Sequence, residues 1–138
     1  MAYPVQKSDA EWREELDPQR YHVLREAGTE RPFTNEYWQH DEVGTYKCAA
    51  CDIPLFTDVE KFESSCGWPA FYQAVEGGRV EEHSDVSFGM RRVEVRCSNC
   101  GSHLGHVFND SPHVPTGLRY CINSASLVFE PGSASSAE

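Results

Sequence analysis

The stretch Met90-Arg91-Arg92-Val93-Glu94-Val95-Arg96 leads directly into Cys97-Ser98-Asn99-Cys100, and together these residues decide the fold of the chain. Apolar and charged residues alternate through Val93-Glu94-Val95, which predicts a β-strand with one apolar face and one polar face. The C-x-x-C turn that follows is a typical half of a metal site. The stretch therefore predicts a strand of a β-sheet that leads directly into one half of a metal site.

A second C-x-x-C turn, Cys48-Ala49-Ala50-Cys51, supplies the other half. Four cysteine sulfurs complete a tetrahedral zinc site, so we expect one structural Zn²⁺ per chain. Cys51 and Cys97 are 46 positions apart, which is longer than the roughly 15–20 residues of a compact zinc ribbon. The site is therefore expected to join distant parts of the domain. Its ligands would be Cys48, Cys51, Cys97 and Cys100.

Other interpretations of these four cysteines remain open. The same residues suit iron for electron transfer, as in rubredoxin-like proteins, and two unlinked cysteine pairs are the simplest alternative. A zinc hydrolase or nucleobase deaminase is less favoured. The deaminase signature places Pro directly before its C-x-x-C turn, whereas here Lys47 and Arg96 precede the two turns.

Helix signals are confined to the N-terminal part. Ser8 and Glu11 form a capping-box pattern, and Asp17 before Pro18 predicts the start of a second helix that Gly28 would end. From about Val43 onward, strand patterns replace them. We expect further strands at 118–122 and 127–129, and hence an all-β assembly behind short N-terminal helices.

Composition narrows the class of protein. The chain has 138 residues and a net charge of −10, with no long basic run, so nucleic acid is not an expected partner. No apolar run is long enough to span a membrane. Residues 1–10 are polar and contain no signal-peptide core, so a cytoplasmic location is expected. In that reducing compartment, C-x-x-C pairs are more often metal sites or catalytic thiols than disulfides.

A candidate nucleophile lies in Arg119-Tyr120-Cys121-Ile122-Asn123. In a strand, Arg119, Cys121 and Asn123 share one face, and the intervening residues face the core. An arginine beside a cysteine favours the thiolate. A small buried cysteine is the common alternative for an isolated Cys, but the polar neighbours of Cys121 argue against its burial.

Two further segments are candidates for the same site. His103 and His106, followed by Asp110, can supply general acids near neutral pH, although such histidines are equally often metal ligands or surface residues. Cys66-Gly67-Trp68-Pro69 joins a second thiol to an aromatic wall in a tight loop. A core tryptophan with an incidental cysteine is the alternative there.

Taken together, these segments resemble the methionine-R-sulfoxide reductases, the MsrB family, in its zinc-containing form. The resemblance runs from about Asp9 to Phe129. It rests on 28–34 (GTERPFT), both C-x-x-C turns, 66–69 (CGWP), 103–108 (HLGHVF) and 119–124 (RYCINS). Several motifs in one order make it specific, and Ala70 is a small departure, since many members have Ser there.

The resemblance implies a role for each matched position. Cys121 matches the nucleophile and Cys66 matches the resolving cysteine. The four cysteines of the two C-x-x-C turns, called the knuckle cysteines below, match the zinc ligands. The remaining catalytic positions would be His103, His106, Asp110 and Asn123. The substrate pocket would be lined by Trp68, Arg119, Phe108 and the two histidines.

The family also implies a fold and a reaction. The expected fold is two antiparallel β-sheets, a β-tent-like sandwich or barrel, forming a single domain over residues 1–130 with a disordered tail at 131–138. The expected activity is thioredoxin-dependent reduction of the R epimer of methionine sulfoxide in proteins, through a Cys121 sulfenic acid and a Cys66–Cys121 disulfide. A monomer is the expected state.

Overall fold

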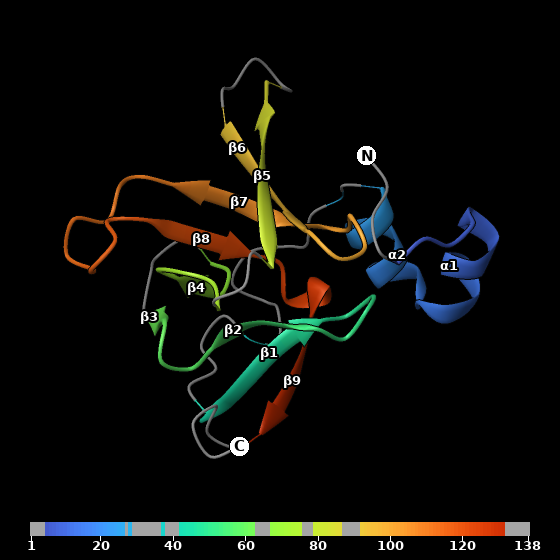
Figure 1. Ribbon diagram of the computed structural model, residues 1–138, viewed down its shortest axis with the longest axis horizontal. Coiled ribbons are helices and arrows are strands. Elements are labelled where there is room, and N and C mark those ends of the chain that lie inside the picture. The colour runs from blue at the N-terminus through green and yellow to red at the C-terminus, as the bar shows by residue number, and fades with distance from the viewer. Residues whose placement is uncertain are drawn as a thin grey trace.

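The computed structural model describes residues 5–26, 28, 37, 42–62, 67–75, 79–86 and 92–131. In these ranges, two short helices precede nine strands, which form two antiparallel sheets (Figure 1). The expected all-β class is therefore confirmed. Within the described ranges, no helix combines the length and apolar character that crossing a membrane requires.

The smaller sheet has the order β2-β1-β9, and the larger has the order β3-β4-β8-β7-β6-β5. The strands of the smaller sheet are β1 (Gly44–Cys48), β2 (Pro54–Thr57) and β9 (Leu127–Pro131). Those of the larger sheet are β3 (Lys61–Phe62), β4 (Ala70–Phe71), β5 (Val80–Asp85), β6 (Arg92–Cys97), β7 (His103–Phe108) and β8 (Arg119–Ile122). A 3-10 turn, η2 (Ser124–Ser126), carries the chain from β8 to β9.

Both helices begin where the capping residues predict. Helix α1 (Asp9–Glu15) has Ser8 as its N-cap, and the reciprocal bonds of a capping box join Ser8 and Glu11. Helix α2 (Pro18–Arg25) follows the N-cap Asp17. It ends three residues before Gly28, whose N–H donates to the His22 carbonyl at 2.9 Å. A Cβ at Gly28 would lie 2.2 Å from the ring of His22, so a larger residue there would require this exposed side chain to turn aside.

An aromatic cluster joins the two sheets. Phe56 of β2 stacks on Phe71 of β4 with ring centroids 4.4 Å apart, and Tyr46 of β1 meets the same Phe71 edge-on at 5.2 Å. All three side chains are fully buried. Each such pair contributes about 0.5–1.5 kcal/mol beyond the burial of its area. The core therefore fixes one sheet against the other.

Some features of the fold differ from what the sequence predicts. Strand β7 was not among the expected strands, although it lies at the centre of the larger sheet between β6 and β8. Pro131, assigned by the sequence to the tail, is the last residue of β9 and pairs with Gly44. Residues 132–138 lie outside the described part, so a disordered tail stays a prediction.

Candidate active site and metal centre

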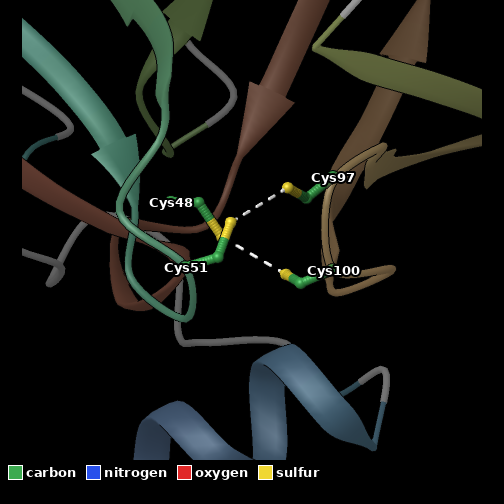
Figure 2. A group of neighbouring side chains, drawn as sticks. All are labelled: Cys48, Cys51, Cys97 and Cys100. Carbon is green, nitrogen blue, oxygen red and sulfur yellow. Dashed lines mark hydrogen bonds between the residues drawn. The ribbon is translucent and has the colours of Figure 1, made fainter. Parts of the chain in front are cut away.

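The four knuckle cysteines come together at the junction of the two sheets. Cys48 ends β1 of the smaller sheet and Cys97 ends β6 of the larger, so each sheet supplies one C-x-x-C turn (Figure 2). The four sulfurs all lie within 4.8 Å of one another. This confirms that the site joins parts of the chain that are distant in sequence.

The two turns share one backbone conformation. The residue after each second cysteine, Asp52 or Gly101, has a positive φ of 69° or 77°. Its N–H donates to the carbonyl of the first cysteine, at 2.7 Å for Cys48 and 2.8 Å for Cys97. Left-handed backbone suits glycine, and aspartate tolerates it better than most residues. These turn hydrogen bonds fix how each turn presents its two sulfurs.

The spacing of the sulfurs fits a tetrahedral metal. Cys48 Sγ lies 3.7 Å from Cys100 Sγ, and Cys51 Sγ lies 3.6 Å from Cys97 Sγ. Metal–sulfur bonds of 2.3 Å at tetrahedral angles place sulfurs about 3.8 Å apart. The four cysteines can therefore hold one metal ion as a closed set of ligands.

Helix α2 braces the second turn. The Arg25 guanidinium donates to the Cys100 carbonyl at 2.9 Å and to the Ser102 hydroxyl at 3.0 Å. The Ser102 hydroxyl in turn lies 3.1 Å from Cys100 Sγ. Trp12 of α1, which is 2% exposed, packs against the same guanidinium at 4.6 Å. The N-terminal helices therefore stabilise the cysteine turn that immediately precedes β7.

The candidate thiol site lies on the polar face of the larger sheet. Cys121 of β8 is paired with His106 of β7, and Arg119 is paired with Phe108. Directly paired residues project from the same face, with Cβ atoms about 4.5–5.5 Å apart. Tyr120 and Ile122 alternate with them and belong to the core, as predicted. Register alone therefore brings the predicted nucleophile beside a predicted acid.

Arg119 covers the thiol. One terminal guanidinium nitrogen donates to Cys121 Sγ at 2.6 Å, and the group lies 4.6 Å from the centre of the Phe108 ring. The expectation that Cys121 is not buried was wrong, because its exposed fraction is 8%. The arginine side chain folds over the sulfur instead of leaving it open to solvent. A positive charge in this position favours the thiolate.

Asp110 holds this arginine. Its two carboxylate oxygens accept hydrogen bonds from Arg119 Nε at 3.0 Å and from a terminal nitrogen at 2.7 Å. These bonds keep the pKa of Asp110 below its ordinary value. The sequence grouped Asp110 with the two histidines as a candidate for acid chemistry. In the structure Asp110 orients Arg119, and a different carboxylate contacts His103.

That carboxylate is Glu94, a residue that sequence reasoning did not select. Glu94 of β6 is 8% exposed and accepts a 2.7 Å hydrogen bond from His103 Nδ1. Its other oxygen accepts from Arg96 Nε at 3.0 Å. Burial alone would raise the pKa of Glu94, but the bonds to His103 and Arg96 outweigh it and lower the pKa to about 2. The feature of the sequence that could have identified Glu94 is a charged residue in the middle of a short strand.

A bulge brings the two histidines together. His103 and His106 are three positions apart, which in a regular strand would place them on opposite faces. The register between β6 and β7 shifts between Val95 and Arg96, as in a β-bulge. The two imidazole rings consequently meet edge-to-face with centroids 5.5 Å apart.

Trp68 and Asn123 are the other predicted site residues that the structure describes. Trp68 is half-buried and lies two residues before Ala70, which pairs with Cys121. Asn123 is buried, and its backbone N–H and side-chain Nδ2 both donate to the Leu104 carbonyl, at 2.9 and 3.1 Å. Cys66 lies outside the described residues, as does most of the 28–34 motif, so the Cys66–Cys121 pair stays a prediction.

Gly105 of β7 offers a test of how closely β7 must approach β8. A Cβ there would lie 2.0 Å from the Cys121 carbonyl oxygen. We expect Gly105→Ala to push the strands apart, to cost about 1–3 kcal/mol of stability, and to lower kcat by moving Cys121 away from His106. Thermal melting and steady-state kinetics measure the two effects.

Gly44→Ala is the matched control for this prediction. Its Cβ would also meet a partner-strand carbonyl, that of Glu130 at 2.3 Å, but in the smaller sheet. It should lose stability while the folded fraction keeps its kcat. If Gly105→Ala and Gly44→Ala had the same kcat, close approach at Gly105 would have no bearing on the thiol.

Comparison with known proteins agrees with the geometry. The family model described as the SelR domain matches residues 16–131. A protein of Agrobacterium fabrum named "Peptide methionine sulfoxide reductase MsrB" is 61% identical over 127 residues, covering 92% of this chain and 93% of its own length. Proteins of the same name from Thiobacillus denitrificans and Chromohalobacter salexigens are 59% and 55% identical, covering 91% and 96% of this chain and 94% and 99% of their own lengths.

Proposed function

The chain belongs to the MsrB family of peptide methionine sulfoxide reductases, and we propose that it reduces the R epimer of methionine sulfoxide in proteins and peptides. The observation that carries the proposal is the environment of Cys121. Its sulfur accepts a hydrogen bond from Arg119 at 2.6 Å, and His106 is its partner on the adjacent strand. A thiolate and an acid on one face are what this reduction needs.

In the first step the Cys121 thiolate attacks the sulfoxide sulfur. A proton reaches the sulfoxide oxygen as the S–O bond polarises, supplied by His103, His106 or a water that they hold. The S–O bond of the substrate and the new S–S bond then break as the protonated oxygen passes to the Cys121 sulfur, so methionine leaves and Cys121 becomes sulfenic acid. The methionine sulfur is reduced by two electrons and Cys121 is oxidised by two. Trp68, half-buried beside β4, would hold the S-methyl group and so select the epimer.

In the second step Cys66 attacks the Cys121 sulfur as a thiolate. A disulfide forms, and the hydroxyl leaves as water after it takes up a proton. Thioredoxin then reduces the disulfide by thiol exchange, which restores both cysteines. This role for Cys66 is supported by the loop that follows it, because Gly67–Pro69 leads into β4 and the Pro69 carbonyl accepts from the Ile122 N–H at 3.1 Å.

Cys66→Ser tests the resolving role. The variant should release about one methionine per protein and then stop cycling with thioredoxin, because the sulfenic acid has no internal thiol to reduce it. Quenched-flow counting of methionine, followed by a coupled thioredoxin assay, measures both quantities. Cycling at the wild-type rate would assign resolution to another thiol or to direct reduction.

The metal in the cysteine cluster is proposed to be one structural Zn²⁺. A closed Cys₄ set leaves no coordination position for substrate, so the ion would stabilise the junction of the sheets and take no part in the chemistry. Iron fits the same sulfur geometry and would favour an electron-transfer protein. Metal analysis separates them, since the zinc form is colourless and the iron form is coloured.

The location, oligomeric state and reductant of the protein are part of the same proposal. The protein would act as a cytoplasmic monomer that repairs oxidised methionine in other proteins, with thioredoxin as its reductant. A coupled thioredoxin assay on separated sulfoxide epimers tests it. The R epimer should be consumed and the S epimer should not. Consumption of neither epimer, or of both equally, would contradict the proposed function.

A further inference from the structure

We propose that Glu94 is a positioning residue for this reaction, which fixes the tautomer and orientation of His103 beside His106, the strand partner of the reacting Cys121. The inference rests on the proposed function and assigns a role to a buried charge that the reaction steps above do not use. It does not require His103 rather than His106 to deliver the proton.

The hydrogen-bonding chemistry of the pair determines where the proton lies. With a pKa of about 2, Glu94 is ionised at any working pH, and an ionised carboxylate can only accept hydrogen bonds. The 2.7 Å contact with His103 therefore requires that Nδ1 carries the hydrogen. In the neutral ring, the lone pair then lies on Nε2. A neutral partner would not impose this choice, because an amide or hydroxyl can accept or donate.

The strand register places Glu94 in line with the thiol. Glu94 of β6 pairs with His106 of β7, and His106 pairs with Cys121 of β8. The three side chains consequently project from one face in adjacent strands. The bulge next to Glu94 turns His103 toward the same line, where its ring meets that of His106. Glu94 thus lies two strands from Cys121 and acts through the imidazoles between them.

Other charged groups face Glu94 and are relevant to any pH dependence. His83, the pairing partner of Glu94 on β5, is bound to Glu81 at 2.7 Å, and Arg96 on β6 pairs with Glu81. Among the described side chains, the charged or titratable groups on this face of β6 and its two neighbouring strands are Arg92, Arg96, His83, Glu81, His103 and His106. Of these, Arg96 and His103 make the bonds that hold the carboxylate.

The test compares Glu94→Gln and Glu94→Ala with wild type and with Glu26→Gln. The last is a matched control, because Glu26 also binds a histidine, His22 Nδ1 at 3.1 Å, but at the C-cap of helix α2. Single-turnover rates, and steady-state kcat and KM, are measured with an R-sulfoxide peptide from pH 5 to 9. Nitrogen-15 NMR of the labelled histidine rings reports which nitrogen of His103 carries the proton. Metal content and melting temperature confirm that each variant is folded.

Glu94→Ala should lower kcat by roughly 10- to 100-fold with KM within about twofold, as expected when an acid group loses its orientation. Glu94→Gln should fall between it and wild type. In both variants the pH–rate profile should move and the Nδ1–H signal of His103 should be lost or mixed. Glu26→Gln should match wild type in all of these.

The inference is overturned if folded Glu94→Gln keeps the wild-type kcat, pH profile and His103 tautomer. It is equally overturned if the rate falls while the pH profile and the His103 signals do not change, since that pattern indicates a merely structural role. Inactivity of the wild-type protein toward both epimers would instead refute the proposed function.

Discussion

Cys121→Ser is expected to lower the rate of methionine sulfoxide reduction by at least about 10³-fold, since removing the nucleophile of a covalent enzyme can cost roughly 10⁶-fold. Serine is nearly isosteric and can still accept the hydrogen bond from Arg119. Its hydroxyl is not ionised near neutral pH, however, so it is a far weaker nucleophile than the thiolate. The fold should therefore persist while the chemistry stops.

The matched comparison for this variant is Cys66→Ser, which makes the same atomic change at the resolving position. Cys66→Ser should complete one turnover, and Cys121→Ser should complete none. The measurement is methionine released per protein with excess R-sulfoxide peptide and no reductant. A full first turnover by Cys121→Ser would move the nucleophile to another cysteine.

Cys97→Ser is expected to have the largest effect on stability. The variant removes one of four ligands and should lose the metal, whose binding in small structural sites contributes about 10–16 kcal/mol of folding free energy. Here the metal would join β1 of one sheet to β6 of the other, so its loss would release the two sheets from each other at that end. Even a third of that energy lowers the melting temperature by roughly 10–20 °C in a domain of this size.

Metal analysis and thermal melting, with and without a chelator, measure this effect. Wild type should contain one zinc per chain and should melt at a lower temperature once the chelator removes it. Cys121→Ser serves as the control, because it makes the same substitution outside the cluster and should retain zinc. A Cys97→Ser protein that keeps one zinc and melts within a few degrees of wild type would contradict a structural role.

The sequence alone predicted those features of the fold and of the site that depend on local interactions. The caps at Ser8 and Asp17 start helices as predicted, because the bonds involved span three residues. Alternation through Arg119-Tyr120-Cys121-Ile122 assigned Tyr120 and Ile122 to the core. The cysteine spacing predicted the cluster, since four ligands of one kind in two turns have few other uses.

The parts that sequence reasoning missed depend on how strands pair. Strand β7 contains two histidines and a glycine, and its apolar residues do not alternate regularly because the register shifts beside them. Glu94 looked like a solvent-facing charge in Val93-Glu94-Val95. It is buried because that face of β6 adjoins the histidines, while Val93 on the other face is 36% exposed. The burial of Cys121 also depends on Arg119, whose side-chain direction no pattern specifies.

The central claim is that Cys121 takes the oxygen from methionine sulfoxide and passes the oxidation to Cys66. The most direct measurement is mass spectrometry of the fully reduced protein after one equivalent of R-sulfoxide peptide, with thiols trapped at successive times. We expect one methionine per protein, a transient sulfenic acid on Cys121, and then a Cys66–Cys121 disulfide with the four knuckle cysteines unmodified. Release of methionine with oxidation confined to the knuckle cysteines, or no release at all, would contradict the account.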